Sequence, residues 1–120
     1  MLRVFVYGSL LRGMENHSVL DGAEFVSTAH TRSQFQMLDL GRYPAVIAGG
    51  ESIVGELYRV SEQHLLRLDA FERVPELYVR HKTVLDDGQS AWIYLYNTSV
   101  HDVDAFGKIP RVPEGDWVAW

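Results

Sequence analysis

The sequence predicts an α+β domain that is built on a curled sheet or barrel and carries one well-defined helix. Most of the chain consists of short runs rich in β-branched and aromatic residues, and one segment has the spacing and flanking residues of an amphipathic helix. Glycines at positions 41, 49, 50 and 55 stand where strands can bend. A doubly wound α/β fold is disfavoured because helical patterns do not alternate with the strand-like runs.

The first strand is expected at residues 2–7, an apolar run that contains Arg3 and stops at Gly8. Five further runs have the composition of strands, at residues 24–31, 33–40, 53–60, 78–85 and 91–96. The tripeptide Asp86-Asp87-Gly88 separates the last two runs and has the turn chemistry of a β-hairpin. These two strands are therefore expected to pair.

The predicted helix covers residues 62–72. Ser61 is a suitable N-cap, Val60 and Leu65 occupy the two positions of a hydrophobic staple, and Pro75 prevents the helix from continuing. At about 100° per residue, one face of this helix carries, in angular order, Phe71, Leu68, Glu72, Leu65 and Asp69.

Glu72 thus falls in the middle of the apolar face. A glutamate is rarely buried there without a partner or a function. Two interpretations stay open at this point. Either the helix frays near Pro75 and Glu72 turns to solvent or to a nearby arginine, or Glu72 is a functional acid.

Length and composition exclude several classes of protein. The 120 residues predict one domain, 1–120, with a core that needs no metal or disulfide. Eleven basic against 16 acidic residues give a net charge of -5, which weighs against nucleic acid as a partner. The absence of cysteine excludes disulfides and thiolate chemistry. No apolar run reaches the ~18 residues of a membrane span, and no secretory signal pattern is present, so a cytoplasmic protein without a membrane partner is expected.

The glycine turn after the first strand, Tyr7-Gly8-Ser9-Leu10, is the first candidate for chemistry. It is not a phosphate-binding loop, because Met14 and Glu15 stand where such a loop has Lys and Ser or Thr. Consecutive N–H groups in such a turn can form an anion-binding nest or an oxyanion hole. The alternative is a purely structural turn in which Ser9 is only a cap.

Other nucleophile and metal chemistry finds little support. Ser9 lacks the Gly-x-Ser-x-Gly pattern of a hydrolase elbow. The histidines at 17, 30, 64, 81 and 101 have no metal-ligand spacing, so no metal or cofactor is expected, and they are interpreted as surface or hydrogen-bonded structural residues. Trp92, Tyr94 and Tyr96 share one face of a strand, and this row either packs in the core or forms part of a pocket.

The tail, 103–120, can cover the barrel, form a wall of the pocket or contact a second subunit, and the oligomeric state stays open.

Several short motifs, taken together and in order, carry a resemblance. They are Val6-Tyr7-Gly8-Ser9-Leu10 with Arg12-Gly13 and Asn16-His17, Tyr43-Pro44, Val54-Gly55-Glu56-Leu57-Tyr58, Leu68-Asp69-Ala70-Phe71-Glu72, Tyr78-Val79-Arg80 and Gly115-Asp116-Trp117. The ordered set covers nearly the whole chain and resembles the γ-glutamylcyclotransferase family.

The resemblance implies a small, mostly antiparallel β-barrel flanked by helices, with the Tyr-Gly-Ser-Leu turn and a single glutamate in one pocket. By this resemblance Tyr7, Gly8, Ser9 and Leu10 would bind the γ-glutamyl group, and Glu72 would be the catalytic acid and base. Tyr78 matches a tyrosine that lies near the glutamate in relatives acting on γ-glutamylamines. Many relatives place Gly directly after the glutamate, where this chain has Arg73.

The resemblance implies an enzyme that releases 5-oxoproline from a small-molecule γ-glutamyl amide, with a γ-glutamylamine as the favoured substrate branch. Two other hypotheses stay open. The same pocket can belong to a non-catalytic binding protein for a γ-glutamyl or similar zwitterionic metabolite. In a purely structural or interaction protein, Glu72 would be a buried acid paired with an arginine.

Overall fold

A computed structural model describes residues 2–101 and 109–120 of the chain. The strands are β1 (Leu2–Val6), β2 (Glu24–His30), β3 (Phe35–Asp39), β4 (Pro44–Ala48), β5 (Val54–Val60), β6 (Tyr78–Val84), β7 (Ser90–Tyr96) and β8 (Arg111–Val112). The helices are α1 (Glu62–Phe71) and the short 3-10 helix η1 (His17–Leu20). All six predicted strands and the predicted helix are confirmed, with ends that differ by one or two residues.

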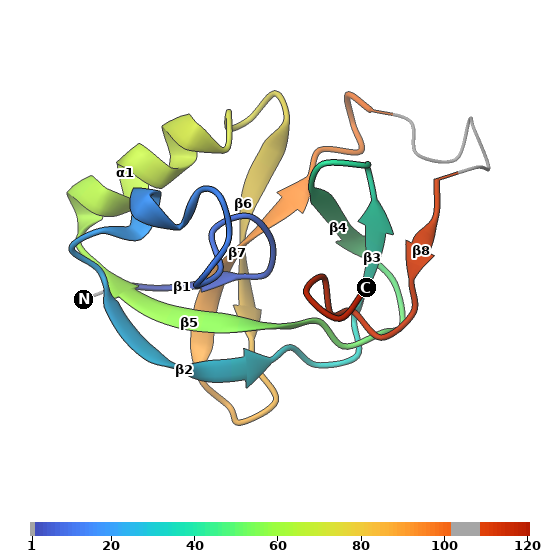
Figure 1. The fold of residues 1–120 in the computed structure, drawn as a ribbon, viewed down its shortest axis with the longest axis horizontal. Helices are drawn as coiled ribbons and strands as arrows, with labels where there is room; N and C mark the ends of the chain where they lie inside the picture. Colours follow the sequence, from blue (N-terminus) through green and yellow to red (C-terminus); the bar gives the residue numbers. More distant parts are fainter. Residues whose placement is uncertain (1, 102–108) are drawn as a thin grey trace.

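The strands form two sheets. The larger has the order β2-β5-β1-β7-β6, and the smaller has the order β4-β3-β8 (Figure 1). Every pair is antiparallel except β1 with β7, which run parallel. The hairpin of β6 and β7 is confirmed in a register that pairs Tyr78 with Tyr96. Its turn needs Gly88, whose φ of 90° lies in the left-handed region.

Two buried clusters hold these layers together, one on each face of the large sheet. Between the sheets, Phe5, Leu57 and Ile93 pack against Met37 and Val46 of the small sheet. On the opposite face, Leu65 and Leu68 of α1 pack on apolar side chains of β1, β5 and β7. Because the clusters alternate along β1, this strand is buried from both sides, as its nearly continuous apolar sequence predicts.

The α+β class is confirmed, but a closed barrel is not. The edge strands β2 and β6 approach one another only at an isolated bridge between Thr31 and Leu85. The large sheet therefore curls without a continuous ladder across the gap. Strands β3 and β4 leave it and pair with each other and with β8, and one α-helix, rather than several, is present in the described residues.

Strands β4 and β8 were not predicted. The five residues of β4 start at Pro44 and stop before Gly49, and their short apolar run has no alternation to mark a strand. Partner β3 supplies the missing information, because Phe35 pairs with Ala48 and Asp39 with Pro44. Strand β8 has two residues and exists only through its pairing with Met37 and Leu38.

Helix α1 begins as predicted and ends at Phe71. The Ser61 hydroxyl accepts a hydrogen bond from the His64 N–H at 3.0 Å, so the predicted N-cap is confirmed. Leu65 and Leu68 are buried, whereas Phe71 is 39% exposed and does not belong to the packed face. Among the described residues, no helix is long and apolar enough to cross a membrane.

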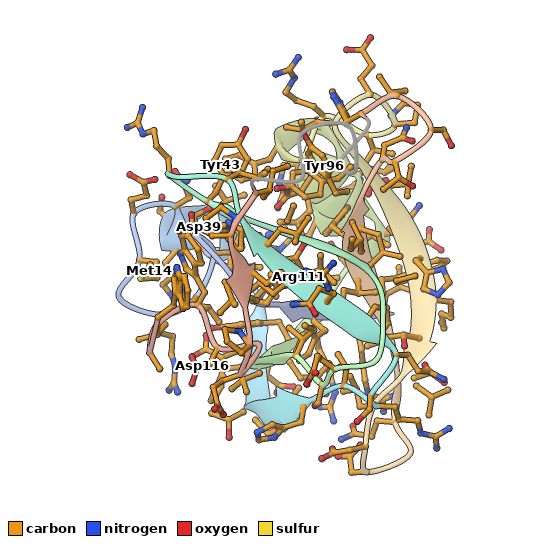
Figure 2. All side chains as sticks on the ribbon, turned by 90° about the vertical axis from the view of Figure 1, so that its right-hand side faces the viewer. Met14, Asp39, Tyr43, Tyr96, Arg111 and Asp116 are labelled. Carbon is orange, nitrogen blue, oxygen red and sulfur yellow. The ribbon has the colours of Figure 1, made fainter. Side chains whose placement is uncertain are left out.

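The described part of the tail, 109–120, lies along the small sheet. Val112 is buried, Trp117 packs against the core between the sheets, and the Trp120 Nε1–H donates to the Asp39 carboxylate at 2.9 Å. Figure 2 looks toward this side of the molecule and shows Arg111 of β8 in front of it. This segment covers the core, and residues 102–108 of the predicted tail lie outside the described residues.

Candidate functional site

A cavity of about 290 Å³ opens where several elements end close together. Strand β1 stops at Val6, helix α1 stops before Glu72, and strands β4 and β6 begin at Pro44 and Tyr78. All six predicted site residues line this cavity: Tyr7, Gly8, Ser9, Leu10, Glu72 and Tyr78. Residues from positions 7 to 78 are thus brought together by the antiparallel return of β5 and the crossover through α1.

The turn formed by Gly8, Ser9 and Leu10, called here the 8–10 turn, has its carbonyl groups tied into the following loop. Gly8 C=O accepts from the Leu11 N–H at 3.1 Å, Ser9 C=O from the Asn16 N–H at 3.0 Å, and Leu10 C=O from His17 Nδ1 at 2.9 Å. A carbonyl can only accept, so His17 carries its proton on Nδ1.

The N–H groups of the 8–10 turn are free of partners among the described residues. The C=O of one residue and the N–H of the next point in opposite directions across a trans peptide plane. Carbonyls turned into the loop therefore leave the N–H groups of Ser9 and Leu10 on the other side of the turn. Consecutive free donors of this kind can bind an anion or a developing oxyanion.

Gly8 is required for this geometry by close packing. A Cβ at position 8 would lie 2.8 Å from Cγ and 2.9 Å from Cδ of Pro44. The Pro44 ring, at the start of β4, therefore sets how near the turn lies to the rest of the cavity wall. This contact explains on physical grounds why the turn contains glycine here.

Glu72 lines the cavity at the C-terminal end of α1. It is partly buried, caps the C-terminal end of α1, and its N–H donates to Leu68 C=O at 2.8 Å. Burial raises the pKa of Glu72 to about 7. Among the described residues the Glu72 carboxylate has no hydrogen bond or ion pair, and each ion pair joins other residues.

Four tyrosines line the cavity, and three of them donate their hydroxyl protons to groups other than Glu72. Tyr7 donates to the backbone carbonyl of Tyr94, and Tyr78 donates to that of Pro44 at 2.8 Å. Burial is the main cause that raises the pKa of each phenol. For Tyr7 the next causes are the neighbouring Tyr78 and the negative charge of Glu72, and for Tyr78 the next cause is the charge of Glu72, so both phenols stay protonated.

Tyr94 is the third of these phenols, and its hydroxyl donates to Asp69 Oδ1 at 2.7 Å. Asp69 in turn receives Arg80 Nε at 3.2 Å. A phenol that donates its proton can still accept a hydrogen bond. The three oxygens can therefore receive N–H groups of a bound ammonium, while the Glu72 carboxylate gains no donor from them.

Sequence reasoning left Tyr94 undecided between packing and a pocket. The structure shows both, because Tyr94 packs under α1 and also lines the cavity. Figure 2 shows Tyr43 and Tyr96 at the same end of the molecule. Tyr43 is 39% exposed and forms part of the cavity wall, and Tyr96 packs edge-on against Tyr78 at 5.7 Å between ring centroids.

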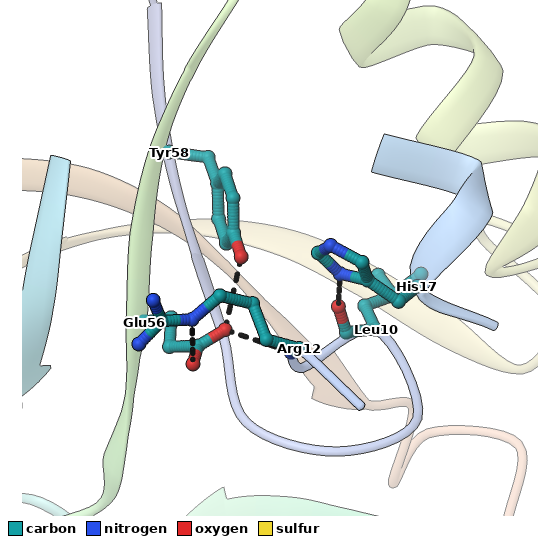
Figure 3. Close-up of polar contacts among 5 residues, drawn as sticks. All are labelled: Leu10, Arg12, His17, Glu56 and Tyr58. Atoms are coloured by element: carbon teal, nitrogen blue, oxygen red, sulfur yellow. Dashed lines mark hydrogen bonds and ion pairs between the residues drawn. The ribbon is translucent and has the colours of Figure 1, made fainter. Parts of the chain in front are cut away.

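The pairing of Arg12 with Glu56 beside the turn was not predicted. Among the described residues Glu56 is the one acid that is buried, and it binds Arg12 and Tyr58 (Figure 3). A signal was present in the sequence, since Glu56 interrupts the buried strand Val54–Val60 with a charge that needs a partner. Its partner is separated by 44 positions and could not be chosen from periodicity.

Nucleophilic serine and metal chemistry find no support in the geometry. No hydrogen bond among the described residues joins the Ser9 hydroxyl to a histidine. His17 and His64 bind backbone carbonyls, of Leu10 and Val19, which confirms for these two the predicted structural role. Within the described part of the chain, no three His, Asp or Glu side chains are grouped closely enough to hold a metal ion.

The fold and cavity define a class of small α+β proteins whose cavity combines the unpaired carboxylate of Glu72 with a turn whose N–H groups are free among the described residues. The family model described as gamma-glutamyl cyclotransferase, AIG2-like, matches residues 4–119. The chain therefore belongs to this family.

Individual relatives agree with that assignment. A Vibrio cholerae protein that carries the name gamma-glutamylcyclotransferase provisionally is 36% identical over 95% of this chain and 93% of its own. Gamma-glutamylaminecyclotransferase A of zebrafish, Danio rerio, is 32% identical over 89% of this chain and 75% of its own. The solution structure of the Escherichia coli protein YtfP has a TM-score of 0.75 at 31% identity, and the match covers 98% of this chain and 96% of that one.

Proposed function

We propose that the protein is a cyclotransferase that releases 5-oxoproline from a γ-glutamyl amide, with Glu72 as its acid and base. Family membership supports cyclotransferase chemistry in general. The single observation that carries the assignment to this site is Glu72, a partly buried and unpaired carboxylate with a pKa of about 7 in the cavity.

The reaction needs no nucleophile from the protein. The α-amine of a γ-glutamyl group can attack the γ-carbonyl carbon of the same molecule and close a five-membered ring. Orienting such an intramolecular attack is equivalent to an effective concentration of about 10⁵ to 10⁸ M. Walls formed by Tyr7, Tyr78 and the 8–10 turn would hold the γ-glutamyl group folded for this attack.

Glu72 would move the protons. Its carboxylate takes one proton from the α-ammonium group, the freed nitrogen bonds to the γ-carbon, and the carbonyl electrons pass to the oxygen. When this oxyanion collapses, the γ-amide C–N bond breaks and Glu72 returns its proton to the leaving nitrogen. The new ring nitrogen loses its extra proton to water, and the released amine takes one up. A group with a pKa near the working pH is suited to both transfers.

The N–H groups of Ser9 and Leu10 would stabilise the oxyanion. They belong to the 8–10 turn, and no described residue uses them. Loss of one such donor typically lowers the rate by about 10² to 10³. Ser9→Ala keeps both N–H groups, so it is expected to cost little, whereas a nucleophilic Ser9 would lose essentially all turnover.

A γ-glutamylamine is our proposed substrate branch. Two observations support it: Tyr78 stands in the cavity wall with Glu72, and the zebrafish relative is named for γ-glutamylamine cyclisation. The leaving amine would extend past Tyr43 and Phe71, which are exposed at the cavity rim.

The test is a mass-spectrometric assay for 5-oxoproline with γ-glutamylamines and γ-glutamyl amino acids as substrates. Glu72→Gln is expected to lower turnover by about 10² to 10⁴ while substrate affinity stays within a few-fold. Glu62→Gln, an exposed acid at the other end of α1, is the matched control and should behave as wild type. Full activity in Glu72→Gln would contradict the assignment.

Two other outcomes would favour the alternative functions. Ligand binding in calorimetry without product from any substrate would identify a binding protein, with Glu72 as a recognition residue. A Glu72→Leu protein that is more stable and binds the ligand unchanged would indicate a purely structural role.

A further inference from the structure

An ion pair with a buried carboxylate connects the loop after β1 to strand β5 beside the proposed reaction site. Glu56 stands in β5, paired in register with Val6 of β1, and it is 9% exposed. Arg12 lies in the loop that follows the 8–10 turn (Figure 3). Neither residue has a role in the proposed proton transfers.

The Glu56 carboxylate receives three hydrogen bonds. Oε1 accepts from the backbone N–H of Arg12 and from the Tyr58 hydroxyl, each at 3.0 Å, and Oε2 accepts from Arg12 Nε at 3.0 Å. Burial acts to raise the pKa of Glu56, but the hydrogen bonds and charge of Arg12 outweigh it and hold the pKa below its usual value. Glu56 is therefore ionised across the pH range in which Glu72 titrates.

The guanidinium of Arg12 is also held from its other side. It lies over the Phe25 ring, with Cζ 3.9 Å from the ring centroid, and Phe25 packs against Tyr58 at 5.5 Å. The side chain thus rests between an aromatic surface and a carboxylate. The restraint passes to the Arg12 backbone through the hydrogen bond from its own N–H to Glu56.

His17 attaches the far end of the same loop. Its Nδ1–H donates to Leu10 C=O, and its ring lies 6.2 Å from that of Tyr58. Both Arg12 and His17 therefore relate the loop to one segment of β5, Glu56 to Tyr58. Their chain neighbours Leu11 and Asn16 donate to the Gly8 and Ser9 carbonyls, and these carbonyls belong to the same peptide groups as the free N–H groups of Ser9 and Leu10.

We propose that Arg12 and Glu56 are positioning residues, which hold the 8–10 turn so that its free N–H groups meet the oxyanion formed in the cavity. The inference rests on the proposed function, but its geometric part can be tested without turnover. The pair is distinguished from a mere surface ion pair by its buried carboxylate and by its link to backbone. The exposed ion pair of Arg59 in β5 with Glu24 in β2, 2.7 Å apart, provides the contrast.

The variant is Glu56→Gln, which keeps the shape and removes the charge, and the matched control is Glu24→Gln. Hydrogen exchange of peptides that cover residues 8–17 is expected to become at least about 10-fold faster in Glu56→Gln and to stay unchanged in Glu24→Gln. The value of kcat is expected to fall about 10- to 100-fold, with KM within a few-fold, because the donors act on the transition state. The pH midpoint, which reports Glu72, is expected not to move.

Arg12→Met gives a second route if Glu56→Gln does not fold, since the Arg12 side chain is 53% exposed. It should reproduce the faster exchange and lower kcat, and Arg12→Lys should restore part of both. Unchanged exchange in the 8–17 segment would overturn the inference, and so would faster exchange with full kcat. A wild-type protein without turnover on any substrate would instead contradict the proposed function, and exchange would still decide whether the ion pair holds the turn.

Discussion

At the scale of single residues, the ionisation of Glu72 connects stability with activity. The pKa of its carboxyl is raised to about 7 in the fold, against 4.5 for an ordinary glutamate. The folded protein therefore binds a proton that the unfolded chain releases between these two values. Protonated Glu72 costs the fold little, whereas ionised Glu72 destabilises it as the pH rises through about 7.

Glu72→Gln is expected to stabilise the protein at pH 8 by up to about 3 kcal/mol, and by close to nothing at pH 4, where both side chains are neutral. Urea unfolding of wild type and variant at several pH values measures this difference. Glu62→Gln, the exposed control, should show no such pH-dependent gain. An equal effect of Glu72→Gln at pH 4 and pH 8 would mean that burial does not raise the pKa of Glu72.

The same ionisation predicts the pH dependence of activity. The proposed base must be a carboxylate before it can take the substrate's proton. The value of kcat/KM should accordingly rise with pH through a midpoint near 7 and level off above it, since this ratio reports the free enzyme. A midpoint near 4.5 in the measured profile would assign the base to an ordinary exposed acid.

Single residues also show how far sequence reasoning reaches. The place of Glu72 on an apolar helix face and the glycine turn could both be found from spacing, because each is a local pattern. The free N–H groups of Ser9 and Leu10 could not, since they depend on the hydrogen bonds by which Leu11 and Asn16 hold the Gly8 and Ser9 carbonyls. Glu56 was visible as a misplaced charge, but its partner Arg12 depends on the tertiary fold.

At the scale of elements, α1 is well predicted at its start and less well at its end. Ser61 and Leu65 act locally, so the N-terminus follows from sequence. The C-terminus is set by Arg73, which has a φ of 54°, in the left-handed region that favours glycine. The Val74 N–H bonds to Asp69 C=O at 3.0 Å and closes the end of the helix.

Arg73→Gly is expected to stabilise the fold by about 0.5 to 1 kcal/mol, because relief of the left-handed strain exceeds the extra freedom of glycine in the unfolded chain. The ion pair of Arg73 with Glu76, at 4.0 Å and exposed, contributes little that would be lost. Arg67→Gly, at an exposed position within α1, is the matched control and should destabilise by about 1 kcal/mol. Chemical denaturation compares the two variants. A destabilised Arg73→Gly protein would show that contacts of the Arg73 side chain stabilise the fold by more than its left-handed backbone conformation costs.

At the scale of the whole molecule, the two faces of the large sheet differ in what packs on them and in their relation to the cavity. The face under α1 carries the cavity, with Tyr78 and Tyr94 in both the packed cluster and the cavity wall. The other face is covered by the small sheet and the described tail; Pro44, at the start of β4, lines the cavity, and the residues of the described tail do not. The sequence did not indicate this division, and it left a curled open sheet and a closed barrel undecided, because both features depend on β4 and β8, which long-range pairing creates.

This division predicts that stability and turnover can be separated on the tail side. Val112 of β8 is 1% exposed and packs in the cluster between the sheets, so Val112→Ala should lower the free energy of unfolding by about 2 kcal/mol. At temperatures where the variant stays folded, its kcat/KM for a γ-glutamyl amide should equal that of wild type. Thermal unfolding and the 5-oxoproline assay, run on the same preparation, measure both quantities. A loss of kcat/KM in fully folded Val112→Ala protein would instead show that the small sheet determines the shape of the cavity from behind, through Pro44 at the start of β4.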